Sequence, residues 1–190
     1  MSISSKEKAY REALIRIEKA KETNSNELDL SELALGKIPE EITQLEKLNK
    51  LNLDLNELEV LPDFIENLQD LEYLDLQSNY LVELPPALFQ LTRLKTLILR
   101  RNKIKNLPPS IGNLKNLKEL QLGGNSLASL PDSLQHLSDM TTFNLNNNQL
   151  ERLPDWIGDL TKLTSLQIGE NFLDELPKSL GNLVHLTNLD

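Results

Sequence analysis

Asparagine and proline each recur along this chain at a strict interval of 23 residues. Self-similarity with a period of about 20–50 residues is typical of proteins that stack copies of one short unit, because a single unit cannot bury its apolar face alone. The chain is therefore expected to fold as a stack of such units. The asparagines are Asn56, Asn79, Asn102, Asn125, Asn148 and Asn171, and the prolines are Pro39, Pro62, Pro85, Pro108, Pro131, Pro154 and Pro177.

The repeated unit reads L-x-x-L-x-L-x-x-N-x-L-x-x-L-P-x-x-I/L-x-x-L-x-x. Leucine accounts for 44 of the 190 residues and aromatic residues for only 4 %, as expected when one leucine pattern supplies most of the core. In the first copy Leu33 stands at the asparagine position, so this copy is degenerate. The repeats begin with this degenerate copy at 25–47, continue with six regular copies at 48–70, 71–93, 94–116, 117–139, 140–162 and 163–185, and end with a truncated eighth at 186–190.

The physics of the unit predicts one short parallel strand per copy. In the L-x-L segment alternate side chains face opposite sides, so the leucines point inward and their neighbours point outward. An asparagine amide can both donate and accept, so the six recurring asparagines are expected to bridge to the backbone of the next copy as an internal ladder. The Leu-Pro step ends the inward turn, and the following residues return at roughly helical spacing. The result should be a curved right-handed solenoid with its strands on the concave face.

This pattern resembles leucine-rich repeats of the 23-residue type with a Leu-Pro step, which occur in intracellular Ras-binding and scaffold proteins and in bacterial multidomain GTPases of the Roco type. The resemblance covers residues 28–190. The stretch 9–20, leading into residues 27–30, also resembles bacterial Roco-type N-termini, although no nucleotide-binding motif accompanies it. The resemblance implies an α/β solenoid of the leucine-rich-repeat horseshoe type.

Both ends of the repeat array depart from the pattern. Residues 1–24 are expected to form an N-terminal capping segment, with a helix over 4–24 that starts at a capping box of Ser4 and Glu7. An apolar stripe of Tyr10, Leu14 and Ile17 would cover the first copy. The sequence stops inside the strand of its eighth copy. We therefore expect either that it is part of a longer protein, which we favour, or that a monomeric chain can associate end to end through an uncapped C-terminus.

Composition excludes several kinds of chemistry. The chain has no cysteine, and its 20 basic and 29 acidic residues give a net charge of −9, which argues against nucleic acid and anionic membrane as partners. His136 and His185 lie in different copies without neighbouring carboxylates at a metal-like spacing. No phosphate-binding glycine motif is present. We expect a cytoplasmic protein that is not an enzyme and that has no cofactor, no metal and no catalytic residues.

The outward positions between the leucines carry the remaining information. Most are small and polar, including Asn144, which is expected to be exposed. One group differs, because aromatic and arginine side chains are the residues that anchor interfaces and an apolar Ile98 has no core role there. Gly123 and Gly124 would leave room beside it for a partner's side chain. The candidate protein-binding residues are Tyr73, Ile98, Arg100 and Arg101, with Asp54 and Asp75 placed to pair with Arg100, and with Tyr80 and Lys103 in the loop beyond the strand.

These observations predict a non-catalytic protein–protein interaction module or scaffold that binds a protein partner of unknown identity on its concave face. The alternative interpretation of the candidate residues is a solvated face held by salt bridges, which contribute only about 0–1 kcal/mol each. Two other roles are compatible with the sequence. The chain could be the regulatory repeat segment of a larger Roco-like GTPase, or a secreted host-directed effector.

Overall fold

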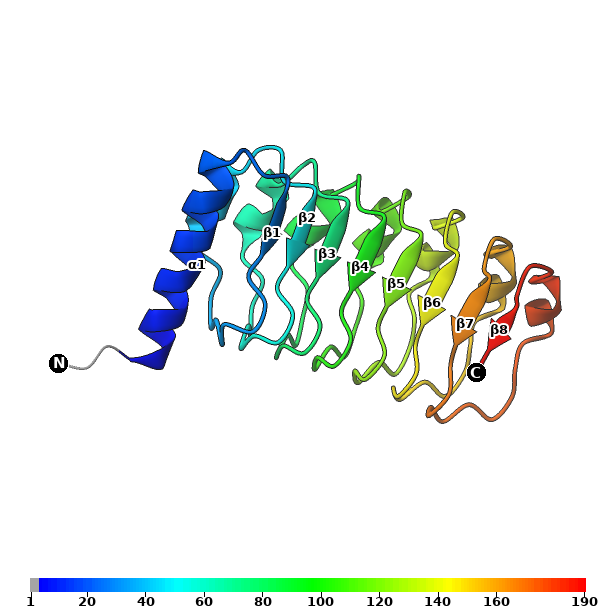
Figure 1. The fold of residues 1–190 in the computed structure, drawn as a ribbon. Coiled ribbons are helices and arrows are strands. Elements are labelled where there is room, and N and C mark those ends of the chain that lie inside the picture. Colours follow the sequence, from blue (N-terminus) through cyan, green and yellow to red (C-terminus); the bar gives the residue numbers. More distant parts are fainter. Residues whose placement is uncertain (1–3) are drawn as a thin grey trace.

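The computed structural model describes residues 4–190 and contains one sheet of eight parallel strands in chain order (Figure 1). Each strand pairs with the next at an offset of 23 residues, as in the pair Leu51 and Leu74. We call each 23-residue unit a coil and number its positions from its first leucine. The strands are β1 (Glu27–Asp29), β2 (Lys50–Asn52), β3 (Tyr73–Asp75), β4 (Thr96–Ile98), β5 (Glu119–Gln121), β6 (Thr142–Asn144), β7 (Ser165–Gln167) and β8 (Asn188–Leu189).

The chain returns from each strand through a short 3-10 helix that lies behind the sheet (Figure 1). Every such helix begins directly after the recurring proline, whose fixed φ suits the extended residue before a helix; the φ of Pro85, for example, is −70°. The predicted helical spacing is therefore realised by 3-10 rather than α-helices. They are η1 (Glu40–Gln44), η2 (Asp63–Asn67), η3 (Pro86–Gln90), η4 (Pro109–Asn113), η5 (Asp132–His136), η6 (Asp155–Asp159) and η7 (Lys178–Asn182).

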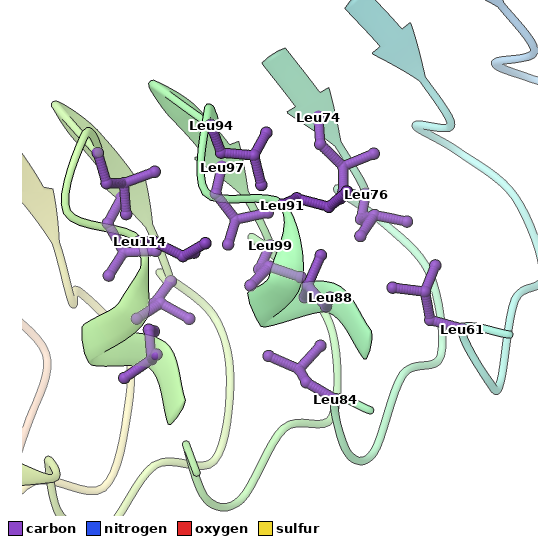
Figure 2. Packing of buried hydrophobic residues seen from close by; sticks show 14 of the residues in the cluster. Leu61, Leu74, Leu76, Leu84, Leu88, Leu91, Leu94, Leu97, Leu99 and Leu114 are labelled. Carbon is purple, nitrogen blue, oxygen red and sulfur yellow. The ribbon is translucent and has the colours of Figure 1, made fainter. Parts of the chain in front are cut away.

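The leucines form one continuous core between the strands and the 3-10 helices (Figure 2). Strand leucines such as Leu74 and Leu97 meet Leu88 and Leu91 from the returning segment, and all four are fully buried. Burying a leucine side chain contributes about 1.5–3 kcal/mol, so this repeated contact is the main source of stability in every coil. The prediction of an α/β solenoid with an N-terminal helix is confirmed.

The N-terminal helix α1 (Ser5–Glu22) packs beside β1 at the start of the array (Figure 1). The side chain of Ser4 accepts a hydrogen bond from the backbone N–H of Glu7 at 3.2 Å and caps the helix. This is one of the two hydrogen bonds of the predicted capping box; the Glu7 carboxylate accepts from Arg11 Nη2 at 2.8 Å. The buried line is not centred on Tyr10 and Leu14, which are only partly buried. It consists of three alanines and one isoleucine, because small side chains let the helix approach the first coil closely: Ala9, Ala13, Ile17 and Ala20.

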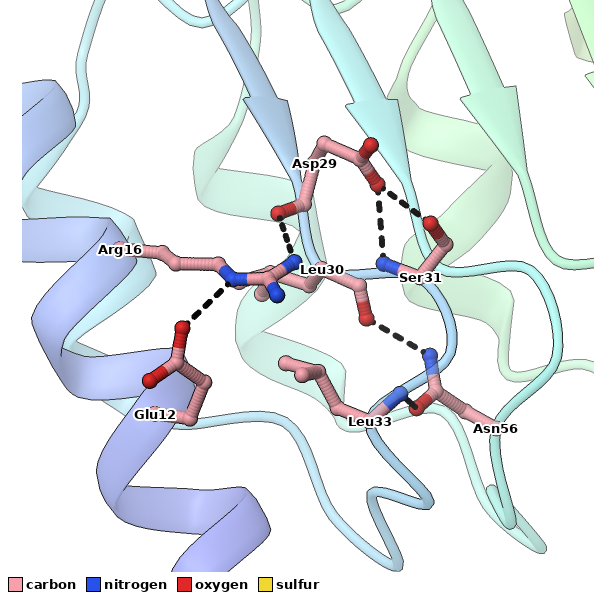
Figure 3. A network of polar contacts seen from close by, with 7 residues as sticks. All are labelled: Glu12, Arg16, Asp29, Leu30, Ser31, Leu33 and Asn56. Atoms are coloured by element: carbon pink, nitrogen blue, oxygen red, sulfur yellow. Dashed lines mark hydrogen bonds and ion pairs between the residues drawn. The ribbon is translucent and has the colours of Figure 1, made fainter.

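Arg16 of α1 replaces the contact that a preceding coil would provide. In the sheet, the carbonyl at position 5 accepts an N–H from the coil before it, as Asn52 O does from Leu30 N at 2.8 Å. Asp29 lies in the first coil, and its carbonyl instead accepts from Arg16 Nη1 at 3.1 Å, while Arg16 Nε binds Glu12 at 3.0 Å (Figure 3). The helix therefore satisfies an edge carbonyl of the sheet as well as covering the core.

The six recurring asparagines make one repeated set of hydrogen bonds. In Asn102, Oδ1 accepts from the backbone N–H of Leu81, and Nδ2 donates to the carbonyls of Leu76 and Leu99 at 2.9 and 3.1 Å. Leu76 and Leu81 belong to the preceding coil, so the predicted direction of the ladder was wrong: each amide ties its own turn to the coil before it. Asn56 does the same for Leu30 and Leu33 (Figure 3).

At the C-terminal end the leucine pattern is left open. Leu189 is 49 % exposed, whereas Leu166, its partner one coil earlier, is fully buried. Leu176 is 48 % exposed and Leu153, 23 residues before it, is 5 % exposed. The end of the array therefore presents an apolar surface.

Candidate functional site

The solvent side of the sheet, which we call the strand face, is formed by positions 3 and 5 of each strand and by positions 7 and 8 just after it. The side chains at positions 3 and 5 are mostly half-buried, because those of neighbouring coils lie one strand spacing apart, about 4.8 Å. Position 8 has a left-handed backbone in all seven coils that contain it, with φ from 52° to 73°. Its residues are Glu32, Leu55, Ser78, Arg101, Gly124, Asn147 and Glu170.

The structure brings four of the predicted binding residues together on the strand face. Ile98 is the register partner of Asp75, and Tyr73 lies on the same strand as Asp75. Ile98 is half-buried, and Arg100 and Arg101 follow it with exposed side chains. Among residues 4–190 no carboxylate lies within 4.0 Å of either guanidinium. We call the surface made by Tyr73, Ile98, Arg100 and Arg101 the basic patch.

The predicted pairing of Asp54 and Asp75 with Arg100 does not form. Asp75 Oδ1 accepts the backbone N–H of Gln77 at 2.9 Å, and its Oδ2 accepts the hydroxyl of Tyr73 at 3.2 Å. Burial, followed by repulsion from Asp54, raises the pKa of the Asp75 carboxyl above its ordinary value. Burial and the nearby Asp75 charge raise the pKa of Tyr73 to about 12. The aspartates therefore repel each other beside the patch instead of orienting its arginines.

Two lysines lie over the tyrosines of this region. Lys103 Nζ is 4.6 Å from the centre of the Tyr80 ring, and Tyr80 itself is 45 % exposed. Lys50 Nζ is 5.5 Å from the centre of the Tyr73 ring and 3.6 Å from a carboxylate oxygen of Glu27. Sequence reasoning missed Lys50, although the 23-residue register that pairs it with Tyr73 would have indicated it.

Leu55 is a second residue that sequence reasoning missed. It occupies position 8 with φ 54°, and its side chain is 50 % exposed. A left-handed backbone is unusual for any residue with a bulky side chain, and glycine or asparagine adopts it at lower cost. The sequence does not indicate this left-handed backbone, because position 8 carries residues as different as glutamate, leucine, serine and glycine.

The space predicted beside Gly123 is filled by the side chain of Asn144, and Gly124 lies in contact with Arg101. A Cβ on Gly123 would lie 2.8 Å from Asn144 Oδ1, and a Cβ on Gly124 would lie 3.4 Å from Arg101 Cγ. Asn144 is consequently only 2 % exposed, not exposed as predicted. Gly123 therefore provides room for Asn144 of the same chain, whereas Gly124 is half-buried beside Arg101.

Within residues 4–190, no group of three or more histidine, cysteine or acidic side chains is placed to hold a metal ion. His136 and His185 are both exposed and lie in separate coils. No helix in the described part of the chain is long and apolar enough to cross a membrane.

Comparison with known proteins identifies the repeat. Residues 46–104 and 92–150 match the family model described as leucine rich repeat. A leucine-rich repeat protein of Leptospira interrogans is 32 % identical with a TM-score of 0.68, over 91 % of this chain and 56 % of its own. Internalin C2 from Listeria monocytogenes is 27 % identical with a TM-score of 0.72, over 79 % of this chain and 64 % of its own.

A plant receptor shares the same architecture. The ectodomain of the Arabidopsis thaliana receptor kinase GASSHO1/SCHENGEN3, in complex with CASPARIAN STRIP INTEGRITY FACTOR 2, is 28 % identical with a TM-score of 0.68, over 92 % of this chain and 25 % of its own. The chain thus spans between a quarter and two thirds of the length of these relatives. No curated protein matches it in sequence. The family match extends over more than half of the chain, and this protein belongs to the leucine-rich repeat family.

Proposed function

We propose that this chain is a non-catalytic binding module whose strand face recognises a protein partner through the basic patch. Proteins of the leucine-rich repeat family generally mediate protein–protein interaction. The observation that carries the proposal is the exposure of Arg100 and Arg101 without a carboxylate partner in a chain of net charge −9. Some basic side chains are paired across coils, as in Arg93 with Asp70, and others, such as Arg152, are unpaired within the described part of the chain. Arg100 and Arg101 differ in being adjacent arginines on the strand face beside Ile98.

The chemistry of the patch suits an interface. Tyrosine and arginine contribute disproportionately to binding free energy, and half-buried Ile98 gives the patch an apolar floor. Exposed Tyr80, with Lys103 over its ring, and exposed Leu55 extend the candidate surface beyond the strands. The plant receptor ectodomain that shares this architecture is itself seen in complex with CASPARIAN STRIP INTEGRITY FACTOR 2.

The proposal is tested by affinity capture with the whole chain as bait. A variant carrying Tyr73→Ala and Arg100→Glu should capture the partner at least tenfold more weakly, since anchor residues contribute about 2 kcal/mol or more each. The melting temperature should fall little, because Arg100 is exposed and Tyr73 only half-buried.

The matched control is Arg152→Glu. This variant makes the same charge reversal at exposed position 13 of coil 140–162, outside the strand face. Capture by this control should equal that of the wild type. Equal capture by all three proteins would remove the basic patch from the interface.

The setting of this interaction is also a proposal. We infer a cytoplasmic protein of the Ras-binding or scaffold type, with a Roco-like GTPase segment and a secreted host-directed effector as alternatives. Cell fractionation followed by immunoblotting tests the location. The exposed apolar end around Leu189 would support end-to-end association, which light scattering over a concentration series would reveal as a rise in mass; otherwise the chain is monomeric.

A further inference from the structure

One backbone N–H after each strand has an acceptor in some coils and not in others. In four coils the Asp or Asn side chain at position 5 accepts the N–H of position 7, two residues further on, at 2.9–3.0 Å. In this way a carboxylate or amide oxygen lies over the same point of the strand face, coil after coil. The four pairs are Asp29 with Ser31, Asn52 with Asp54, Asp75 with Gln77, and Asn144 with Asn146.

Coil 94–116 lacks this side-chain acceptor. Its position 5 is Ile98, whose side chain cannot accept a hydrogen bond, and its position 7 is Arg100. No acceptor for the backbone N–H of Arg100 is present among the residues that the structure describes. In the coil before it, the equivalent N–H of Gln77 is bound by Asp75. A neutral apolar side chain has therefore replaced an oxygen directly beside two unpaired arginines.

Among the coils without a position-5 acceptor, only coil 94–116 combines an open N–H with positive charge. Coils 117–139 and 163–185 also lack this hydrogen bond, but both carry glycine at position 7. Gly123 is buried beneath Asn144, and Gly169 lies against the carboxylate of Asp190. Arg100 is exposed, and the Arg101 guanidinium follows on the next residue.

We propose that the backbone N–H of Arg100 and the guanidinium groups of Arg100 and Arg101 bind a carboxylate of an Asp or Glu side chain from a partner protein. The partner's carboxylate then does for coil 94–116 what the Asp75 side chain does for coil 71–93. We commit to a side chain because an aspartate side chain takes this N–H in the preceding coil 71–93 and in coil 25–47. Hydrogen bonds in which the acceptor is ionised are about twice as strong as neutral ones. This inference rests on the proposed function and specifies the partner's chemistry.

The test is an NMR titration of the whole chain with blocked tripeptides. Acetyl-Gly-Asp-Gly-amide should move the Arg100 amide proton downfield in a saturable manner. The amide of Gln77, whose acceptor Asp75 is in place, should not respond. The tripeptide with Asn in place of Asp should bind about tenfold more weakly, the ratio expected for the loss of charge from the acceptor.

A substitution of Ile98 can supply the missing acceptor for the Arg100 N–H from within the chain and so block the site. Ile98→Asp restores the residue type that Asp29 and Asp75 show to be compatible with this position, so the variant should fold. In this variant the Arg100 amide proton should already resonate downfield of its wild-type position in the free protein. Its chemical shift should no longer respond to the Asp peptide. Ile98→Asn should give the same result without added charge, and serves if Ile98→Asp is destabilised.

Three outcomes overturn the inference. They are an Arg100 amide that does not respond to the Asp peptide, an Ile98→Asp variant that still binds it, and tighter binding of acetyl-Gly-Gly with a free C-terminal carboxylate. The first two reject the site, and the third rejects the side-chain source. If capture still depends on Tyr73 and Arg100 while the Asp peptide fails, the proposed function stands and only the carboxylate subsite is wrong.

Discussion

At the scale of single residues, one asparagine side chain in each regular coil forms hydrogen bonds with several backbone groups. Each ladder asparagine supplies one acceptor and two donors to groups that would otherwise be buried without partners. Leu33, at the same position in the first coil, has no such task because helix α1 lies against this coil in place of a preceding coil. Its N–H is instead bound by Asn56 from the coil that follows (Figure 3).

Asp75→Asn should stabilise the protein at neutral pH. Burial and the Asp54 charge raise the pKa of the Asp75 carboxyl, so the folded state binds the proton more tightly than the unfolded state does. Stability from this group is therefore lost as pH rises from the ordinary value of 3.8 through the raised pKa. Asn keeps the acceptor for Gln77, as Asn52 does for Asp54, and removes the repulsion, a gain of about 0.5 kcal/mol.

Urea unfolding of wild type and variant near neutrality and in acid measures this effect. The gain should be present at neutral pH and absent well below pH 3.8, where both side chains are uncharged. Asp139→Asn is the control with the opposite sign. Its hydrogen bond with Lys162 lowers the pKa of Asp139, so this stabilisation is present above the ordinary pKa and is lost in acid. A variant Asp75→Asn that is less stable at neutral pH contradicts the assignment.

At the scale of elements, the spacing between successive 3-10 helices is narrow in some pairs and wider in others. The backbone of Gly158 in η6 lies so near η7 that an added Cβ would be 2.3 Å from the carbonyl oxygen of Ser179. Gly112 in η4 approaches Ser133 of η5 in the same way, at 2.7 Å. Trp156 in η6 instead reaches toward the helix before it and donates from Nε1 to Asp132 at 3.1 Å. Glycine and serine therefore set the tight contacts, and the large tryptophan occupies the wider one.

Gly158→Ala should destabilise the protein by about 1–3 kcal/mol, because overpacking against backbone cannot be relieved by a rotamer change. Gly181→Ala is the matched control, since Gly181 occupies the same position of coil 163–185 and its added Cβ has nothing within 4 Å. Thermal unfolding of the two variants should separate them clearly. Equal melting temperatures would show that η6 and η7 are not held at this spacing.

The period predicted the coils, strands and core, because a 23-residue repeat with alternating leucines leaves one way to bury them. It also located Ile98 as an anomaly on the strand face. It could not show the burial of Asn144, which depends on a glycine in the neighbouring coil, nor the left-handed backbone at Leu55. It could not exclude a pairing between Asp75 and Arg100 either. Such features arise between coils, where side-chain direction rather than sequence spacing decides the contact.

At the scale of the whole molecule, each coil is stabilised by its contacts with the neighbouring coils. A solenoid behaves approximately as a row of units joined by nearest-neighbour contacts, so its two ends are the places where it opens most easily. The N-terminal end is closed by α1, which supplies apolar cover through Ala13 and a donor to the sheet through Arg16. The described C-terminal end exposes Leu176 and Leu189. Exchange of backbone amides should therefore be slowest in the central strands.

Ala13→Glu should open the first coils while leaving distant ones intact. Ala13 is fully buried against the first coil, and placing an unpaired carboxylate there costs about 2 kcal/mol or more. Hydrogen exchange should accelerate most in β1, less in β2, and hardly in β6 and β7, because each coil contacts only its neighbours. Ile15→Glu, on the solvent side of the same helix with Ile15 63 % exposed, should leave every strand unchanged. Equal acceleration across all eight strands would show that the array unfolds as one unit, and that α1 holds the whole solenoid rather than its first coil.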